Sequence, residues 1–287
     1  MNALPAPTPS SAAPLSELPV TEDRGSGRIA GTDLTVAFKS RAGRNTALEN
    51  VSFAVGGGEF VALLGPSGCG KSTLLNVIAG IVQPTGGSVA IDGVAVSRPQ
   101  PKCGVVFQQH SLFPWMTVLE NVAFGPQMLG FADPLGAARK LLRTVGLEGY
   151  EAAWPESLSG GMKQRVGIAR ALAVNPPVLL MDEPFGALDA QTRSIMQEEL
   201  LKLWSEFHST IVFVTHDIDE AIFLSDRILV MKTSPGGIRQ EIVVDIPRPR
   251  GPEVIGSEAF RRIRQRIFGL IREETLKVFR AGGASGS

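Results

Sequence analysis

The chain has 287 residues, of which 44% are hydrophobic, so it can bury the core of one large α/β domain or of two small ones. Its 28 lysines and arginines equal its 28 aspartates and glutamates, a balance that gives no overall field favouring nucleic acid or an anionic lipid surface. Two cysteines, Cys69 and Cys103, are too few for a disulfide framework, which excludes a disulfide-stapled secreted domain and favours a reducing, cytosolic compartment.

The first 27 residues are dominated by Pro, Ala, Ser and Thr and lack the basic start and apolar block of a secretory signal. We expect residues 1–27 to be a disordered leader. Apolar runs such as Phe60–Leu64 and Val178–Met181 are strand-sized, far below the roughly 20 residues that cross a bilayer. The sequence therefore predicts no membrane span.

An antiparallel β segment is expected after the leader. Leu34–Phe38 and Val51–Val55 have the composition and alternation of strands, and a loop rich in Gly and Arg is predicted between them at Ser40–Asn45. Phe60–Leu64 then forms a continuous apolar run, which is typical of a strand buried on both faces.

This buried strand leads into a glycine-rich loop and a helix expected over Thr73–Gly80, the order that a phosphate site requires. Glycines let successive backbone N–H groups point at one set of phosphate oxygens, and the helix adds its positive N-terminal end. A lysine can hold the β- and γ-phosphates and a hydroxyl can bind Mg²⁺. The loop matches GxxxxGK[ST] and consists of Gly65, Pro66, Ser67, Gly68, Cys69, Gly70, Lys71, Ser72 and Thr73.

Strands and helices alternate along the rest of the domain, which predicts a largely parallel sheet. The expected strands are Val105–Phe107, Val178–Met181, Ile211–Val214 and Arg227–Met231, and the expected helices are Leu135–Val145, Gln164–Ala173 and Thr192–Phe207. Between Leu112 and about Pro155 the pattern is mostly helical, which indicates an inserted helical subdomain over about residues 110–160.

The C-terminal part, residues 247–287, follows a nucleotide-binding domain that we place at residues 28–246. It begins with the proline-rich connector Pro247–Pro252 and continues with apolar residues at helical spacing, namely Phe260, Ile263, Ile267, Leu270 and Ile271. We expect an amphipathic helix that packs on its own domain, with a membrane-surface role as the alternative.

Two carboxylates follow the apolar strand Val178–Met181. Ligands of open α/β sheets bind at the carboxyl ends of the strands, where Asp182 can hold Mg²⁺ and Glu183 can orient or deprotonate the attacking water. An ordinary polar strand end is the alternative when this pair is taken alone. Together with the phosphate loop, the pair predicts nucleotide hydrolysis, with Glu183 as the general base.

One segment resembles the LSGGQ signature of ATP-binding cassette (ABC) proteins, about 20 residues before the acidic strand end. It runs Leu158, Ser159, Gly160, Gly161, Met162, Lys163, Gln164 and Arg165, with Met162 where Gln is usual. The resemblance implies an ABC-type P-loop ATPase fold of the α/β class. In that fold, a mostly parallel core is joined by an N-terminal antiparallel β subdomain and an inserted helical subdomain.

Other segments resemble further ABC motifs in the expected order. Gln108 is similar to the Q-loop glutamine, Ala187–Asp189 to the D-loop and His216 to the switch histidine. The resemblance implies that Gln108 senses the metal and the permease and that His216 contacts the γ-phosphate. Adenine stacks on an upstream aromatic residue in this family, for which Phe38 is the candidate, with a buried core Phe as the alternative.

The resemblance also implies a head-to-tail homodimer in which each ATP, with its Mg²⁺, lies between the phosphate loop of one chain and Ser159, Gly160 and Gly161 of the other. It implies integral membrane permease subunits as partners, a periplasmic or surface solute-binding protein as an indirect partner, no nucleic acid, and a peripheral position on the cytoplasmic face of the inner membrane.

The segments Phe107–Trp115, Leu119–Val122 and Asp182–Arg193 resemble the nitrate, sulfonate and taurine importer ATPases. This resemblance implies uptake of a small oxoanion, with Trp115 where the permease docks, although a buried or merely partly exposed Trp is the alternative. Only about 50 residues follow Met231–Pro235, so the β-rich regulatory domain of sugar importers is not expected. The alternatives are an importer for another solute and an ABC ATPase acting on nucleic acid or ribosome. A simple phosphate-loop kinase is not expected, because it would lack the signature and switch motifs.

Overall fold

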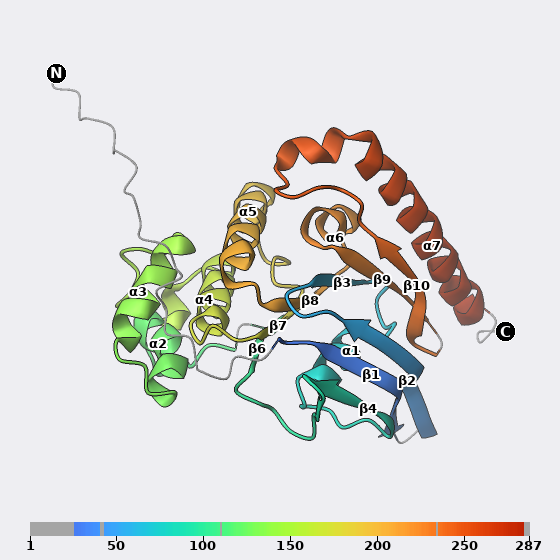
Figure 1. The fold of residues 1–287 in the computed structure, drawn as a ribbon, viewed down its shortest axis with the longest axis horizontal. Helices are drawn as coiled ribbons and strands as arrows, with labels where there is room; N and C mark the ends of the chain where they lie inside the picture. The colour runs from blue at the N-terminus through green and yellow to red at the C-terminus, as the bar shows by residue number, and fades with distance from the viewer. Residues whose placement is uncertain (1–25, 41–42, 110, 234, 284–287) are drawn as a thin grey trace.

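The computed structural model describes residues 26–283 except 41, 42, 110 and 234. The expected leader therefore lies outside the described residues, apart from Ser26 and Gly27. Two sheets form the framework of the described part, and helices surround the larger one (Figure 1).

The smaller sheet is antiparallel, with strand order β2-β1-β4-β5. Its strands are β1 (Ile29–Ser40), β2 (Gly43–Val55), β4 (Gly86–Ile91) and β5 (Val94–Ala95). The loop expected over Ser40–Asn45 is wrong for most of its length, because Phe38 pairs with Asn45 and Ser40 with Gly43. The hydrogen bonds between β1 and β2 join backbone groups and do not depend on the side chains. A Gly- and Arg-rich sequence can therefore continue the hairpin once the adjacent residues of the two strands are paired.

The larger sheet has strand order β10-β9-β3-β8-β7-β6. Its strands are β3 (Phe60–Leu64), β6 (Cys103–Val106), β7 (Val178–Asp182), β8 (Thr210–Thr215), β9 (Arg227–Lys232) and β10 (Gly237–Val243). All neighbours pair in parallel except β9 and β10, which form an antiparallel hairpin at one edge. The prediction of a mostly parallel sheet is therefore confirmed.

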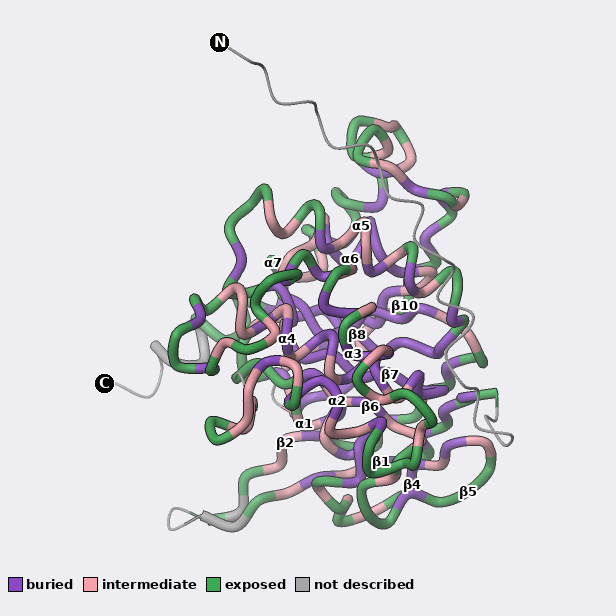
Figure 2. The backbone as a smooth tube through the Cα atoms, turned by 90° about the vertical axis from the view of Figure 1, so that its left-hand side faces the viewer, coloured by how far each residue is buried: buried purple, intermediate pink, exposed green. Residues whose placement is uncertain are grey.

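The central strands are buried along their whole length, as the apolar run Phe60–Leu64 predicted (Figure 2). Successive side chains of a strand point to opposite faces, and β3 shows the consequence. Phe60, Ala62 and Leu64 belong to one apolar core, whereas Val61 and Leu63 belong to a second core on the other face.

Helix α1 (Lys71–Ile78) packs between the two sheets, in contact with β7 and β8 on one side and β2 and β4 on the other. Helices α2 (Val118–Met128) and α3 (Pro134–Thr144) pack on each other and on α4 (Gly160–Leu172) at one end of the molecule (Figure 1). A short 3-10 turn, η2 (Pro155–Ser157), precedes α4.

The remaining helices are α5 (Ala190–Phe207), α6 (Ile218–Leu224) and α7 (Glu258–Gly283), with the 3-10 turn η3 (Pro252–Gly256) before α7. The expected amphipathic segment is the first half of α7, whose Phe260, Ile263 and Ile267 are buried in the domain's own core. This placement agrees with the expectation that the helix packs on its own domain.

The connector before α7 is held by a buried arginine. Arg250 is 6% exposed, and its guanidinium donates to the carbonyl oxygens of Ile222, Phe223 and Ser225 at 3.0, 3.2 and 2.7 Å. It also donates to the carbonyl oxygens of Val244 and Ile246. Burial lowers the pKa of Arg250 to about 10, so the group stays charged at neutral pH. The cation therefore satisfies carbonyls at the end of α6 and in the connector.

Replacing Arg250 with Ala should lower the free energy of unfolding by about 3 kcal/mol, because several buried carbonyls lose a charged donor. Urea unfolding followed by circular dichroism measures the change. Arg261→Ala is the matched control, since that side chain is exposed and makes an i,i+3 pair with Glu258 on the helix surface, and it should shift stability by less than about 0.5 kcal/mol. Equal stability of the two variants would contradict the assignment.

Candidate nucleotide site

Three strands bring the predicted site residues to one edge of the larger sheet. In the parallel pairing, Leu64 of β3 lies opposite Thr215 of β8, and Asp182 of β7 lies opposite Val214. The phosphate loop, the acidic pair and the switch histidine each follow one of these strand ends. They therefore meet at the carboxyl edge, where ligands of α/β sheets bind.

The phosphate loop turns sharply from β3 into α1. Gly68 and Gly70 have φ angles of 80° and 95°, in the left-handed region that favours glycine. A Cβ on Gly70 would also lie 2.6 Å from Leu48 Cδ2 and 2.9 Å from the Ala47 carbonyl oxygen. The loop thus lies close against β2 and directs the first turn of α1, with its unpaired N–H groups, toward the sheet edge.

Lys71 lies within this loop and is 7% exposed. Its Nζ donates to the carbonyl oxygens of Gly65 at 2.7 Å and of Pro66 at 3.0 Å. Ser67 and Gly68 are exposed, Thr73 is half-buried, and Cys69 is buried in the core. Burial raises the pKa of the Cys69 thiol, although the charge of Lys71 acts in the opposite direction. Because the side chain is fully buried, it fills space under the loop.

Ser72 joins the loop to the acidic strand end. Its Oγ donates to Asp182 Oδ1 at 3.1 Å, and Asp182 is 8% exposed. The pKa of the Asp182 carboxyl lies above its ordinary value, mainly because the group is buried. The hydrogen bond from Ser72 and the charge of Lys71 lower this pKa, whereas the charge of Glu183 raises it further. A hydroxyl and a carboxylate at this distance are oxygen ligands suited to Mg²⁺ shared with phosphates.

Glu183 is the meeting point of the predicted catalytic residues. Its Oε2 lies 3.3 Å from His216 Nδ1 and accepts a 3.4 Å hydrogen bond from Gln108 Nε2. Its backbone φ is 47°, the left-handed region that costs a non-glycine residue about 1 kcal/mol, and its N–H donates to the Val214 carbonyl at 3.0 Å. The sheet thus holds this carboxylate in a strained conformation at the edge.

The signature residues lie apart from this cluster. Ser159 caps α4 by accepting from the Met162 N–H at 3.3 Å, and Gly160 and Gly161 form the first turn of that helix. A Cβ on Gly161 would lie 3.0 Å from Leu188 Cδ2, so the signature contacts the D-loop of its own chain. In the described part of the chain, no hydrogen bond or ion pair joins residues 159–161 to residues 65–73.

Asp189 caps α5 and is also away from the phosphate loop. Its carboxylate accepts from the backbone N–H groups of Thr192 and Gln191 at 3.0 and 3.1 Å and from the Thr192 hydroxyl at 2.7 Å. These hydrogen bonds, led by that from the Thr192 backbone, hold the pKa of Asp189 below its ordinary value.

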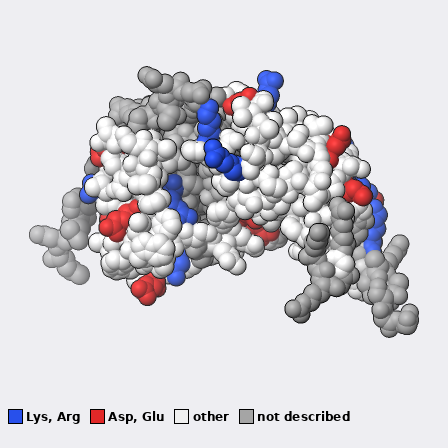
Figure 3. All heavy atoms as spheres, turned by 90° about the horizontal axis from the view of Figure 1, so that it is seen from below, with Lys and Arg blue, Asp and Glu red and all other residues white. Residues whose placement is uncertain are grey.

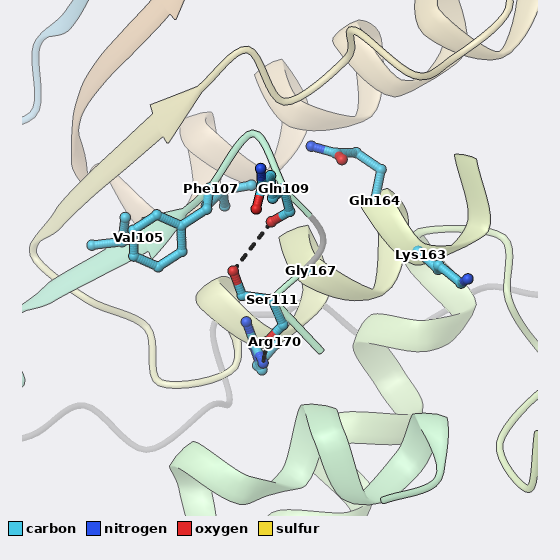
Figure 4. A pocket seen from close by; sticks show the side chains of 9 residues that line it. Val105, Phe107, Gln109, Ser111, Lys163, Gln164, Gly167 and Arg170 are labelled. Carbon is cyan, nitrogen blue, oxygen red and sulfur yellow. Dashed lines mark hydrogen bonds between the residues drawn. The ribbon is translucent and has the colours of Figure 1, made fainter. Parts of the chain in front are cut away.

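The segment after β6 lies against α4 (Figure 4). Arg170 donates to the Ser111 carbonyl at 2.6 Å and lies over the ring of Phe113 at 5.4 Å. Phe113 in turn contacts Trp115, which is 68% exposed, so the buried alternative for Trp115 is wrong. The segment carrying Gln108 is therefore tied to the signature helix and, through the half-buried Phe113, to the exposed Trp115.

Phe38 is 45% exposed near the end of β1, so the buried-core alternative is wrong for it as well. It pairs with Asn45, while Leu48 further along β2 contacts the phosphate loop at Gly70. Its ring thus belongs to the hairpin that supports the loop, and its contact with adenine remains a prediction.

The sequence interpretation missed Glu220, which organises the loop bearing His216. Glu220 is 7% exposed and accepts hydrogen bonds from the Thr215 hydroxyl and from Gln197 Nε2, the latter at 3.0 Å. Burial raises its pKa. Thr215 Oγ1 also accepts from the Asp217 N–H at 3.0 Å. The acidic start of α6 directly after His216 was the available signal.

Comparisons with known proteins identify the family of the chain. The ABC transporter family model matches residues 48–186. An ABC transporter ATP-binding protein of Methanocaldococcus jannaschii, described as uncharacterized, is 47% identical over 89% of this chain and 95% of its own length. An aliphatic sulfonates import ATP-binding protein of Bacillus cereus is 47% identical over 80% of this chain and 90% of its own.

Among solved structures, a dimeric ATP-binding cassette bound to ADP and phosphate after hydrolysis matches with a TM-score of 0.70. It is 36% identical, and the match covers 76% of this chain and all of that one. A second structure, of a dimeric bacterial ABC transporter cassette, has the same TM-score at 37% identity and the same coverage.

The fold and the loop between β3 and α1 define a phosphate-loop nucleotide-binding protein, and the predicted fold class is confirmed. The chain belongs to the ATP-binding subunits of ABC transporters and is similar to the sulfonate importer ATPases. It binds ATP and is an ATPase coupled to transport.

Replacing Asp182 with Asn should stabilise the chain at pH 7 while abolishing its hydrolysis. Burial raises the pKa of Asp182 in the folded state, so folding is more favourable when this carboxyl is protonated. That stability is fully present below the pKa of the unfolded chain and is lost as the pH rises through the pKa of the folded chain. The amide removes that penalty, so the free energy of unfolding should rise by on the order of 1 kcal/mol at pH 7. Urea unfolding at pH 7 and near pH 4 measures the gain, which should shrink at the lower pH.

Glu258→Gln, at an exposed position with its pair to Arg261, is the control and should be neutral at both pH values. A loss of stability in Asp182→Asn at pH 7 would contradict the burial argument.

Proposed function

We propose that the chain is the ATP-hydrolysing subunit of an ABC importer and that it energises uptake of a small oxoanion through a separate permease. The observation that carries the proposal is the convergence of Gln108 and His216 on the Glu183 carboxylate, beside the Ser72–Asp182 pair. A carboxylate held by neighbours at the edge of a phosphate site can orient and deprotonate a water molecule.

In this proposal the residues of the loop bind the triphosphate. The N–H groups at the start of α1 and the Lys71 ammonium bind the β- and γ-phosphates, which requires Lys71 to exchange the Gly65 and Pro66 carbonyls for phosphate oxygens. Ser72 and Asp182, with Gln108, would hold Mg²⁺, which neutralises developing phosphate charge when bound. Glu183 accepts the proton of the water, and His216 contacts the γ-phosphate.

The signature completes the site from a second copy of the chain. Ser159, Gly160 and Gly161 open α4 and form an anion-binding helix start, yet they contact the D-loop of their own chain. Two chains in head-to-tail contact would place the signature and Asp189 of one against the phosphate loop of the other. The dimeric cassette structures support this arrangement.

The permease contact is proposed at Phe113 and Trp115. Trp115 is 68% exposed and contacts Phe113 with the two rings tilted by 34°, and Phe113 is linked through Arg170 to the signature helix. Within the described residues, no helix is long and apolar enough to cross a membrane. The similarity to an import ATP-binding protein supports a peripheral subunit on the cytoplasmic face of the inner membrane, with a solute-binding protein as an indirect partner.

The sulfonate-import relatives support an aliphatic sulfonate as the first candidate cargo, with taurine or nitrate as related oxoanions. A different solute is the alternative that the other relatives leave open. Action on nucleic acid is less well supported, because the formal net charge is zero and the face in Figure 3 carries both acidic and basic side chains.

Glu183→Gln should lower ATP hydrolysis by about 100-fold or more, because the amide cannot take a proton from water. Hydrolysis by the purified chain and uptake of radiolabelled alkanesulfonate, taurine and nitrate by cells should be measured together. Glu199→Gln, a surface residue paired with Lys202, is the control and should leave both unchanged. Loss of hydrolysis with normal uptake of all three oxoanions would refute the cargo class and leave the ATPase.

A mixing experiment tests the head-to-tail dimer. Lys71→Ala and Ser159→Ala should each inactivate their own dimers, whereas a mixed dimer has one site with both residues intact. In an equal mixture, random pairing of the chains makes about half of the dimers mixed, and each mixed dimer has one of its two symmetry-related sites intact. The mixture should therefore regain roughly one quarter of the wild-type activity. A mixture as inactive as its two components would contradict the shared site.

A further inference from the structure

The C-terminal helix is linked to the outer side of the phosphate loop by a buried carboxylate. In Figure 1, α7 runs along the β9–β10 hairpin, past the edge of the larger sheet. Glu274, in the second half of α7, is 1% exposed, although this half of the helix also has the largely exposed Phe279. A buried acid on an otherwise solvated stretch requires an explanation, because burial of an unpaired carboxylate is costly.

The partners of Glu274 come from three places. Its Oε2 accepts from the backbone N–H of Thr233 at 3.1 Å and lies 3.4 Å from the Thr233 hydroxyl. Its Oε1 accepts from Arg239 at 2.9 Å and from Lys277 at 2.7 Å. Burial raises the pKa of this carboxyl, but the hydrogen bonds and charges of Lys277, Thr233 and Arg239 outweigh it and leave the pKa below its ordinary value.

Thr233 begins the turn between β9 and β10, and the other end of that turn lies on the phosphate loop. A Cβ on Gly236 would lie 2.5 Å from the Cys69 carbonyl oxygen and 2.2 Å from that of Ala47. The Gly236 carbonyl also accepts from the Glu49 N–H at 3.0 Å. Gly236 therefore packs against Cys69, two residues before Lys71, and against the β2 segment that supports the loop.

A second contact of the same hairpin lies at the start of the loop. A Cβ on Gly65 would lie 3.0 Å from the Met231 carbonyl oxygen, so β9 lies directly behind the first loop residue. Met231 therefore backs the phosphate loop at Gly65, and Gly236 backs it at Cys69. Movement of these residues away from the sheet would remove the support of the loop on its outer side.

We propose that Glu274 is a positioning residue for nucleotide binding, acting through the β9–β10 turn on the backbone of the phosphate loop. The carboxylate ties the turn to α7, and Gly236 transmits this position to Cys69. The proposal depends on the proposed placement of the triphosphate at residues 65–73. It gives α7 a role in ATP affinity in addition to covering the sheet.

The test measures binding of a fluorescent ATP analogue by the full chain, together with KM and kcat for ATP hydrolysis. Glu274→Ala removes the acceptor of the Thr233 N–H and should weaken binding about fivefold, with KM rising and kcat at saturating ATP changing by less than about twofold. Glu274→Gln keeps one oxygen that can accept this N–H, so it should recover most of the affinity. Glu273→Gln is the matched control, because that exposed residue pairs with Arg239 and, among the residues that the structure describes, makes no hydrogen bond to the turn. It should bind as the wild type does.

Gly236→Ala acts at the other end of the same link and keeps the test decisive if Glu274→Ala does not fold. It should weaken binding at least as much, because its methyl group meets the Cys69 and Ala47 carbonyls. Wild-type affinity in either folded variant would overturn the proposal, as would a lowered melting temperature with unchanged affinity and KM. Lys71→Ala tests the placement of the nucleotide itself. If this variant also binds the ATP analogue with wild-type affinity, the placement of the triphosphate at residues 65–73 is refuted, and the role of Glu274 is refuted with it.

Discussion

The parallel pairing of β3, β8 and β7 is the constraint on which the site depends. Because these strands run in the same direction with Leu64 opposite Thr215 and Asp182 opposite Val214, their carboxyl ends stop at one level. The glycine loop, the acidic pair and the switch histidine come from segments more than 30 residues apart in the sequence, yet each needs only the next few residues of its strand to reach the same edge. The full burial of these strands makes that arrangement rigid.

The polar groups of the site bond to one another. Lys71 donates to carbonyls of its own loop, Ser72 to Asp182, and Gln108 to Glu183. In the proposed function, each of these contacts satisfies a group that phosphate, metal or water would engage during hydrolysis, so binding would exchange hydrogen bonds instead of creating them from unpaired groups. Such exchange keeps the buried charges paired throughout, which the low-dielectric edge of the sheet requires.

Buried charges also attach the C-terminal segment to the core. Arg250 satisfies carbonyls at the end of α6, and Glu274 satisfies the N–H at the β9–β10 turn. Apolar packing by Phe260, Ile263 and Ile267 holds only the first half of α7 on the domain. The second half is held by directional hydrogen bonds and ion pairs, which specify position more strictly than apolar contact does.

The sequence alone determined the class of the protein and predicted most of its candidate site, because residues within each motif are neighbours in the chain: the GxxxxGK[ST] loop, Asp182–Glu183 and the Ser159–Gly161 signature can be recognised without knowing how they meet. The parallel core and α7 were also predictable from apolar runs and helical spacing. Contacts between distant segments were not predictable. The hydrogen bond from Gln197 to Glu220 and the link from Glu274 to Cys69 join residues that are far apart in the sequence. The continued hairpin at Ser40–Asn45 is local, but it forms because the backbone pairing of β1 and β2 extends through it, which composition does not show. Only the tertiary structure decides such pairs, because hydrogen-bond geometry and burial are properties of the folded chain and not of local composition.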